Sequence, residues 1–282
     1  MEIEIQSKSL GAELTSIKFK GEERLHDAKS FWEQQSPILF PIVGKLRYDV
    51  ALINNKEYPI PKHGFAMNMN FEKIGENSYK LVSNKETLEK YPYNFELYVN
   101  YTTDKNKLFF NYKVINKTKE QNMLFGIGGH PGFKCNYSNE KCTVEFEEEE
   151  NNIKIIPVDI SVCLLSDKMI DGNSVIKNKK ILELKKNSFV NDAIIFTDMK
   201  SKSLVLKDNG KKLLKFNFDK FKYLGIWSQE GAPFVCFEPW YNTPDYVNST
   251  KEFKEKKNII ELEPEKEFNI NFSVEFYYNI LI

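Results

Sequence analysis

Alternation of apolar and polar residues constrains the fold of this chain more than any other feature. From Phe268 to Phe276 every second residue is apolar, and the residues between them are Asn, Asn, Ser and Glu. Successive side chains of a β-strand point to opposite faces, so this pattern predicts a half-buried strand. The same period recurs in Leu214–Phe218 and in Ile3–Ile5, and short strand candidates follow one another along the whole chain.

Short polar turn sequences join several of these candidates into hairpins. Turn residues such as Asn-Gly and Asn-Asn tolerate the backbone conformations that tight hairpins require. Three hairpins are predicted, with turns at Asp208-Asn209-Gly210, at Asn54-Asn55 and at Lys105-Asn106.

Helical signals are few and short. Ser83–Tyr91 is predicted to be one helical turn or two, with Ser83 as its cap and Pro92 ending it, and Lys251–Lys257 a second brief helix. Strands and helices do not alternate, which argues against a parallel α/β fold. We therefore predict an all-β protein, a large antiparallel β-sandwich with a few short helices, in which residues 1–282 form a single domain.

Composition excludes some classes of partner. The 40 basic and 40 acidic residues balance, and the predicted pI is 6.9, so bulk charge indicates neither a nucleic-acid partner nor a membrane surface. The N-terminal residues MEIEIQ are acidic, unlike a signal peptide, and no apolar run approaches membrane-spanning length. A cytoplasmic protein is expected, while the oligomeric state stays open.

The four cysteines occur at irregular spacing without a C-x-x-C pair. This spacing is typical neither of a zinc site nor of a disulfide framework, so we expect reduced and mostly buried thiols.

One carboxylate stands out because of the residues around it. Glu238 directly follows the apolar run Phe234–Phe237 and precedes Pro239, which is expected to end the strand. Such an acid is either an ordinary solvated strand end or a general base whose basicity burial has raised. This stretch alone does not decide between them.

Two of the three histidines lie among glycines and prolines. His63 occurs in PKHGF and His130 in GGHPGF, whereas His26 occurs in a charged run and is expected to be a structural surface residue. Either loop histidine alone is more often structural, but the pair with a strand-end acid favours a site. Zinc ligation by the histidines lacks ligand spacing, and a serine hydrolase lacks a nucleophile motif. The acidic run Glu147–Glu150 is expected to be solvated.

Several ordered segments, spread over nearly all of the chain, resemble the aldose 1-epimerase (galactose mutarotase-like) family, and most closely its short bacterial LacX-like branch. They are SPILFPIVGKL (36–46), PKHGFA (61–66), IGGHPGF (127–133), NDAIIF (191–196), YLGIWSQEGAPFVCFEPW (223–240) and PDYVNST (244–250). The resemblance implies a β-supersandwich and interconversion of the α and β anomers of a free aldohexose.

The resemblance also implies residue roles. Glu238 matches the general base that removes the proton of the anomeric hydroxyl, and His130 matches the acid that protonates the ring oxygen. His63 and Asp192 match residues that hydrogen-bond the sugar. The implied chemistry needs a small-molecule sugar but no metal and no organic cofactor.

Other side chains are weaker candidates for sugar contact. The aromatic residues Tyr223, Trp227, Trp240 and Tyr241 can supply an apolar face for the sugar or can simply pack the core. Where much of the family has an arginine on the rim, this chain has Lys45, and Arg47 can replace it if both lie on one face of a strand.

Two alternative functions stay open. A hexose-6-phosphate 1-epimerase is suggested by Lys45, Arg47 and Lys62, which are near two of the matched segments and can bind a phosphate. A non-catalytic carbohydrate-binding or sensing protein on the same scaffold is the other, although binding alone does not need an acid–base pair.

Overall fold

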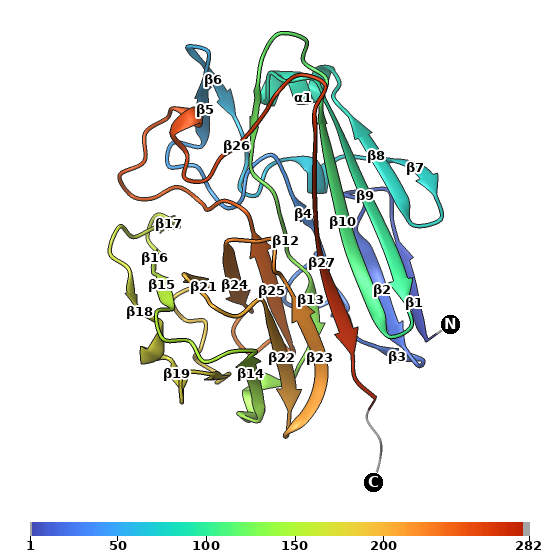
Figure 1. Ribbon diagram of the computed structural model, residues 1–282, viewed down its shortest axis with the longest axis vertical. Coiled ribbons are helices and arrows are strands. Elements are labelled where there is room, and N and C mark those ends of the chain that lie inside the picture. The colour runs from blue at the N-terminus through green and yellow to red at the C-terminus, as the bar shows by residue number, and fades with distance from the viewer. Residues whose placement is uncertain (1, 279–282) are drawn as a thin grey trace.

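Two large antiparallel β-sheets form the body of the protein in the computed structural model, which describes residues 2–278 (Figure 1). The predicted all-β sandwich with few short helices is confirmed. The ten-stranded sheet has the order β19 (Ile176–Lys177), β20 (Ile181–Glu183), β14 (Cys142–Phe146), β22 (Ser203–Asp208), β23 (Lys211–Asn217), β27 (Glu267–Phe276), β10 (Lys107–Asn116), β9 (Phe95–Asp104), β8 (Ser78–Val82) and β7 (Glu72–Gly75).

The eight-stranded sheet carries the residues of greatest functional interest. Its order is β18 (Ile170–Asp171), β15 (Lys154–Ile156), β21 (Ile194–Thr197), β24 (Tyr223–Trp227), β25 (Phe234–Trp240), β12 (Gly128–Gly129) and β4 (Ile38–Leu39), with β13 (Gly132–Lys134) also paired to β25. Smaller sheets contain β1 (Ile3–Ser7), β2 (Leu14–Phe19) and β3 (Glu22–Glu23); β5 (Val50–Ile53) and β6 (Lys56–Pro59); β11 (Met123–Phe125) and β26 (Ile260–Leu262); and β16 (Val158–Asp159) and β17 (Leu164–Leu165).

The alternation in β27 is the clearest link between sequence and core. Ile270, Phe272, Val274 and Phe276 are buried, while the residues between them are half-buried or exposed. The strand pairs with β10, beside which it lies in Figure 1, and the rings of Phe110 and Phe272 stack with centroids 4.3 Å apart. One face of the long sheet therefore supplies a continuous aromatic layer to the core.

Strand β25 is buried on both faces, which explains why it reads as a continuous apolar run. Phe237 packs toward the ten-stranded sheet, with its ring centroid 5.4 Å from that of Phe216. Alternate side chains point to opposite faces, so Glu238 points away from this core. The prediction that Pro239 ends the strand is wrong, because pairing with β24 stays in register through Pro239 to Trp240.

All three predicted hairpins are present, at β5–β6, β9–β10 and β22–β23. Asn54, Asn55, Lys105 and Asn209 adopt the positive φ angles of tight turns.

The short helices differ in detail from their predictions. Helix α1 (Lys85–Lys90) is capped by Asn84 rather than Ser83, and Asn84 and Thr87 form a reciprocal capping box. Only a 3₁₀ turn, Phe253–Glu255, forms within 251–257. Further 3₁₀ turns are Ala66–Asn68, Tyr137–Asn139 and Gly172–Ser174.

Two polar residues that were expected at the surface are buried. His26 is 3% exposed, and its ring stacks against those of Trp32 and Phe234. Its structural role stands, since Nε2 contacts the carbonyl oxygen of Gln34. Within Glu147–Glu150 the first three residues are exposed, whereas Glu150 is buried and accepts hydrogen bonds from two backbone N–H groups.

The cysteines have the predicted state, free and mostly buried, with Cys163 exposed. Within residues 2–278, every helix is too short or too polar to cross a bilayer.

Candidate active site

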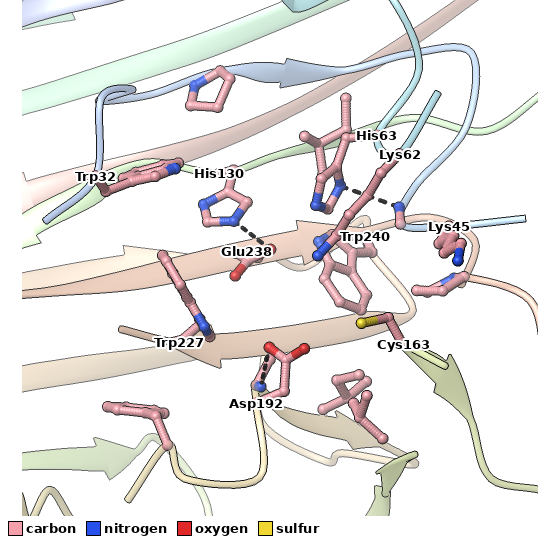
Figure 2. Close-up of a pocket in the computed structure, with 18 of the residues that line it drawn as sticks. Trp32, Lys45, Lys62, His63, His130, Cys163, Asp192, Trp227, Glu238 and Trp240 are labelled. Atoms are coloured by element: carbon pink, nitrogen blue, oxygen red, sulfur yellow. Dashed lines mark hydrogen bonds and ion pairs between the residues drawn. The ribbon is translucent and has the colours of Figure 1, made fainter. Parts of the chain in front are cut away.

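The register of strands β12, β13 and β25 brings His130 opposite Glu238. Gly128 pairs with Trp240 and Gly132 with Cys236, so the intervening residues His130 and Glu238 occupy matching positions. His130 Nε2 lies 3.1 Å from Glu238 Oε2, and both side chains are buried (Figure 2). The local sequence therefore aligns an imidazole and a carboxylate across one strand pair.

Burial sets the protonation of this pair. Desolvation raises the pKa of Glu238 well above its usual value, the nearby Asp192 adds to the rise, and the Lys62 cation opposes it. Desolvation also lowers the pKa of His130, and Lys62 lowers it further. Because a buried site disfavours both charges, the resting pair holds one proton between Glu238 and His130 Nε2. His130 Nδ1 has no hydrogen-bond partner in the described chain.

His63 lies beside this pair in a tight turn. Its φ is +65° and that of Gly64 is +79°, and a Cβ atom at Gly64 would lie 2.0 Å from the carbonyl oxygen of Phe40, so only glycine fits there. The imidazole ring of His63 meets that of His130 edge-on, with centroids 5.7 Å apart.

A backbone hydrogen bond fixes the tautomer of His63. The Gly44 N–H donates to Nδ1 over 3.1 Å, while burial, with help from His130 and Lys62, lowers the pKa of His63 well below its usual value. A neutral ring that accepts at Nδ1 carries its proton on Nε2. That nitrogen points into the cavity, so His63 presents a hydrogen-bond donor there (Figure 2).

Asp192 faces the histidines from the opposite side of the cavity (Figure 2). It lies just before β21 with a φ of +71°, and its Oδ1 accepts a hydrogen bond from the Ala193 N–H over 2.8 Å. This contact orients the carboxylate, and sugar hydroxyls are suitable donors for it.

Aromatic side chains line the cavity around the His130–Glu238 pair. Trp227 and Trp240 line the cavity, while Tyr223 bonds Asn258 and Tyr241 packs against Phe268 outside it. Trp32 was not among the predicted site residues, yet its ring centroid lies 4.7 Å from that of His130. Trp32 comes from an irregular loop without periodicity, so its sequence carried no signal beyond the residue type.

Of the cationic candidates, Lys45 and Lys62 line the cavity and Arg47 does not. The expectation that Lys45 and Arg47 share a strand face is wrong, because residues 41–49 form no strand. The Arg47 guanidinium instead donates to the carbonyl oxygen of Ser249 over 3.1 Å. Lys45 lies 3.7 Å from Asp49, whereas Lys62 pairs with no carboxylate of the described residues.

The cavity enclosed by these residues measures about 550 Å³. This volume falls within the usual range of small-molecule sites. Six of the predicted site residues line it: His63, His130, Asp192, Glu238, Lys45 and Trp227. In the described part of the chain, no cluster of three or more His, Cys, Asp or Glu side chains suits a metal ion.

The sequence pattern of the family described as aldose 1-epimerase matches residues 2–261. The chain belongs to the aldose 1-epimerase family. Protein LacX of Lactococcus lactis subsp. lactis, in its plasmid form, is 35% identical to it over an alignment of 277 residues that covers 92% of each chain. The chromosomal form is equally similar.

Solved structures show the same fold for this aldose 1-epimerase family member. A galactose mutarotase related enzyme from Lactobacillus acidophilus superposes with a TM-score of 0.90 at 29% identity, covering 98% of this chain and 95% of that one. A galactose 1-epimerase from Lactobacillus acidophilus NCFM has a TM-score of 0.72 at 14% identity, with coverages of 98% and 91%. At that identity the likeness extends to the fold alone.

Proposed function

We propose that the protein is an aldose 1-epimerase that interconverts the α and β anomers of a free aldohexose. The observation that carries this proposal is the buried His130–Glu238 pair, 3.1 Å apart, in a cavity that also presents His63 and Asp192. Family membership supports a carbohydrate epimerase, and the site geometry supports the reaction described below.

Ring opening needs a base at one oxygen and an acid at another. The Glu238 carboxylate removes the proton of the anomeric hydroxyl, the C1–O1 bond becomes a carbonyl, and the bond from C1 to the ring oxygen breaks. His130, in its protonated form, gives its Nε2 proton to the ring oxygen as that bond breaks. Rotation about C1–C2 then presents the other face of the aldehyde.

Reclosure reverses both proton transfers. The ring-forming hydroxyl returns its proton to His130 as its oxygen attacks C1, and Glu238 protonates the carbonyl oxygen. The pair therefore holds one proton before and after each step, which matches the single proton favoured by its buried environment.

The remaining cavity residues bind and orient the sugar. The Nε2–H of His63 donates to an oxygen near the ring, and the Asp192 carboxylate accepts from hydroxyl groups. Lys45 binds hydroxyls at the rim, and Trp227 offers an apolar face for the ring.

Anomer exchange measured by NMR saturation transfer tests the proposal directly. A panel of free and 6-phosphorylated aldoses is compared for the wild type, Glu238→Gln and His130→Ala. We expect acceleration by the wild type and a loss of roughly 10²–10⁴-fold in each variant. Sugar binding without any acceleration by the folded wild type would instead indicate a carbohydrate-binding protein.

A hexose-6-phosphate 1-epimerase is the second candidate. Lys62 lies in the cavity without an acidic partner in the described chain, and Lys45 lines the same space. A phosphate can pair with either ammonium group. The same panel separates the two candidates, because this reading requires faster exchange for the 6-phosphates and a loss of that preference in Lys62→Met.

A further inference from the structure

The segment Pro244–Thr250 follows strand β25 and contains a buried acid. Asp245 within it is 4% exposed, and its carboxylate forms an ion pair of 2.6 Å with Lys256, which is 8% exposed. The Lys256 ammonium also donates to the carbonyl oxygen of Thr250 over 2.6 Å. A buried pair is costly to desolvate, so it needs good geometry and further hydrogen bonds.

Asp245 forms two hydrogen bonds with Lys45–Arg47, the rim loop of the cavity. Its backbone N–H donates to the carbonyl oxygen of Lys45 over 2.9 Å, and its Oδ2 accepts the N–H of Arg47 over 2.9 Å. The Arg47 side chain adds its bond to Ser249 in the same segment. Arg47 therefore acts in holding this loop and not in the cavity.

Asp245 also bonds a second side of the cavity. The carbonyl oxygen of Asp245 accepts the N–H of Leu165 over 2.9 Å, and Leu165 lies on β17 and lines the cavity. One buried side chain and its backbone thus connect the rim loop, β17 and the segment that leads to Lys256.

Gly44 links this arrangement to His63. The ring of Pro244 packs so closely on Gly44 that a Cβ atom there would lie 2.2 Å from Pro244 Cγ, and Gly44 has a φ of +65°. On its other side Gly44 exchanges two hydrogen bonds with His63, accepting from the His63 N–H over 2.7 Å and donating to Nδ1 over 3.1 Å.

We infer that the Asp245–Lys256 ion pair positions His63 for the sugar, acting through Gly44 and the Lys45–Arg47 loop. Asp245 and Lys256 are positioning residues, because neither lines the cavity. The pair holds the Gly44 N–H in its orientation. That N–H in turn determines the tautomer of His63 and the direction of its Nε2–H. The catalytic part of this inference rests on the proposed function, but the tautomer does not.

The test removes both charges at once, in Asp245→Ala/Lys256→Met, so that no unpaired charge stays buried. The readout is the ¹⁵N chemical shifts of the His63 ring nitrogens in the sugar-free protein. The chain has three histidines, and a His63→Gln spectrum identifies the signals of His63. In the wild type we expect a protonated Nε2 and an unprotonated Nδ1.

In the double variant we expect the two His63 shifts to move toward each other, as for an imidazole that exchanges between tautomers. We also expect kcat/KM for anomer exchange to fall by up to about 10²-fold, mostly through KM, because the sugar loses an oriented donor. The single variant Lys256→Arg, which keeps the charge beside Asp245, should retain most of both properties.

A matched control removes another ion pair, Lys80–Glu96, which spans 2.7 Å on the ten-stranded sheet. Lys80→Met/Glu96→Ala should leave the His63 shifts and kcat/KM unchanged. Gly44→Ala tests the link from Gly44 to His63 directly. If the double variant does not fold, Asp245→Asn/Lys256→Gln, which removes both charges with less change of shape, tests the pair in its place.

Wild-type His63 shifts in the folded double variant would overturn the inference, as would wild-type shifts in Gly44→Ala. If the wild type accelerates anomer exchange for no aldose, the proposed function fails, yet the His63 shifts still decide the positioning role.

Discussion

Nε2 of His130 lies 3.1 Å from Oε2 of Glu238, and the two residues hold matching positions across the pairing of β25 with β12 and β13. A pair that shares one proton acts as a unit, so its two members are not independent. We expect Glu238→Gln/His130→Ala to lose no more activity than the more damaging single variant, roughly 10²–10⁴-fold. Initial rates of anomer exchange for the four proteins measure this, and multiplied losses would contradict it.

Lys62 should set the acid limb of the pH profile. Burial raises the pKa of Glu238, and the Lys62 cation opposes that rise. The Lys62 cation also lowers the pKa of His130. Because the active pair holds one proton, the acid limb marks the uptake of a second proton, and removing the cation makes that uptake easier. In Lys62→Met we expect the acid limb of kcat/KM to move to higher pH.

Lys62→Arg is the control for that prediction, because it keeps the charge and should keep the limb near its wild-type position. The comparison needs pH profiles of kcat/KM with a neutral aldose, so that any phosphate contact does not contribute. A limb that stays in place in Lys62→Met would show that the cation does not act on the His130–Glu238 pair.

Trp32 should matter for the protonation of His130 as well as for sugar contact. Its ring covers that of His130, and desolvation is the largest cause of the lowered pKa of that histidine. In Trp32→Ala we expect the pKa of His130 to rise toward its ordinary value of about 6.5. An NMR titration of the histidine signals measures it, and Trp32→Phe, which keeps a ring, should show a smaller rise.

The buried histidines should make the fold sensitive to mild acid. His26, His63 and His130 all have lowered pKa values because burial disfavours their charged forms. Below about pH 6.5 the unfolded chain therefore binds more protons than the folded chain, and the free energy of unfolding falls as pH falls. Glu238 acts in the opposite direction, since its pKa is raised in the fold.

Urea unfolding at pH 7.5, 6.5 and 5.5 measures this sensitivity. Each histidine contributes at most about 1.4 kcal/mol per pH unit. His26→Gln should make the slope shallower, because burial lowers the pKa of His26 and the substitution removes its contribution. Lys80→Met should leave the slope as in the wild type. Equal slopes for His26→Gln and the wild type would show that burial of His26 is not coupled to protons.

Most of the fold could be predicted from local sequence patterns. The alternation in β27 and the turn residues of the three hairpins act between neighbours in sequence, so they could be predicted. The position of Pro239 inside a strand could not be predicted. It depends on the neighbouring strand, whose pairing stays in register through the proline. Ser83 and Asn84 are both good helix caps, and only the reciprocal bond with Thr87 selects Asn84.

The candidate site likewise contains residues that could be predicted and residues that could not. Glu238, His130, His63 and Asp192 were predicted from a family resemblance, and the structure places all four around one cavity. Trp32 was missed and Arg47 was misplaced, because the positions of both depend on irregular loops held by distant contacts. Such contacts leave no periodic trace in the sequence.

The four site residues are divided between the halves of the chain by chemistry. His63 and His130, the imidazoles, come from the N-terminal half, and Asp192 and Glu238, the carboxylates, come from the C-terminal half. Neither half contains both members of the His130–Glu238 acid–base pair. Anomer exchange is therefore a natural reporter for a split protein: two fragments divided between the halves regain activity only when they dock with β12 and β13 back in register against β25.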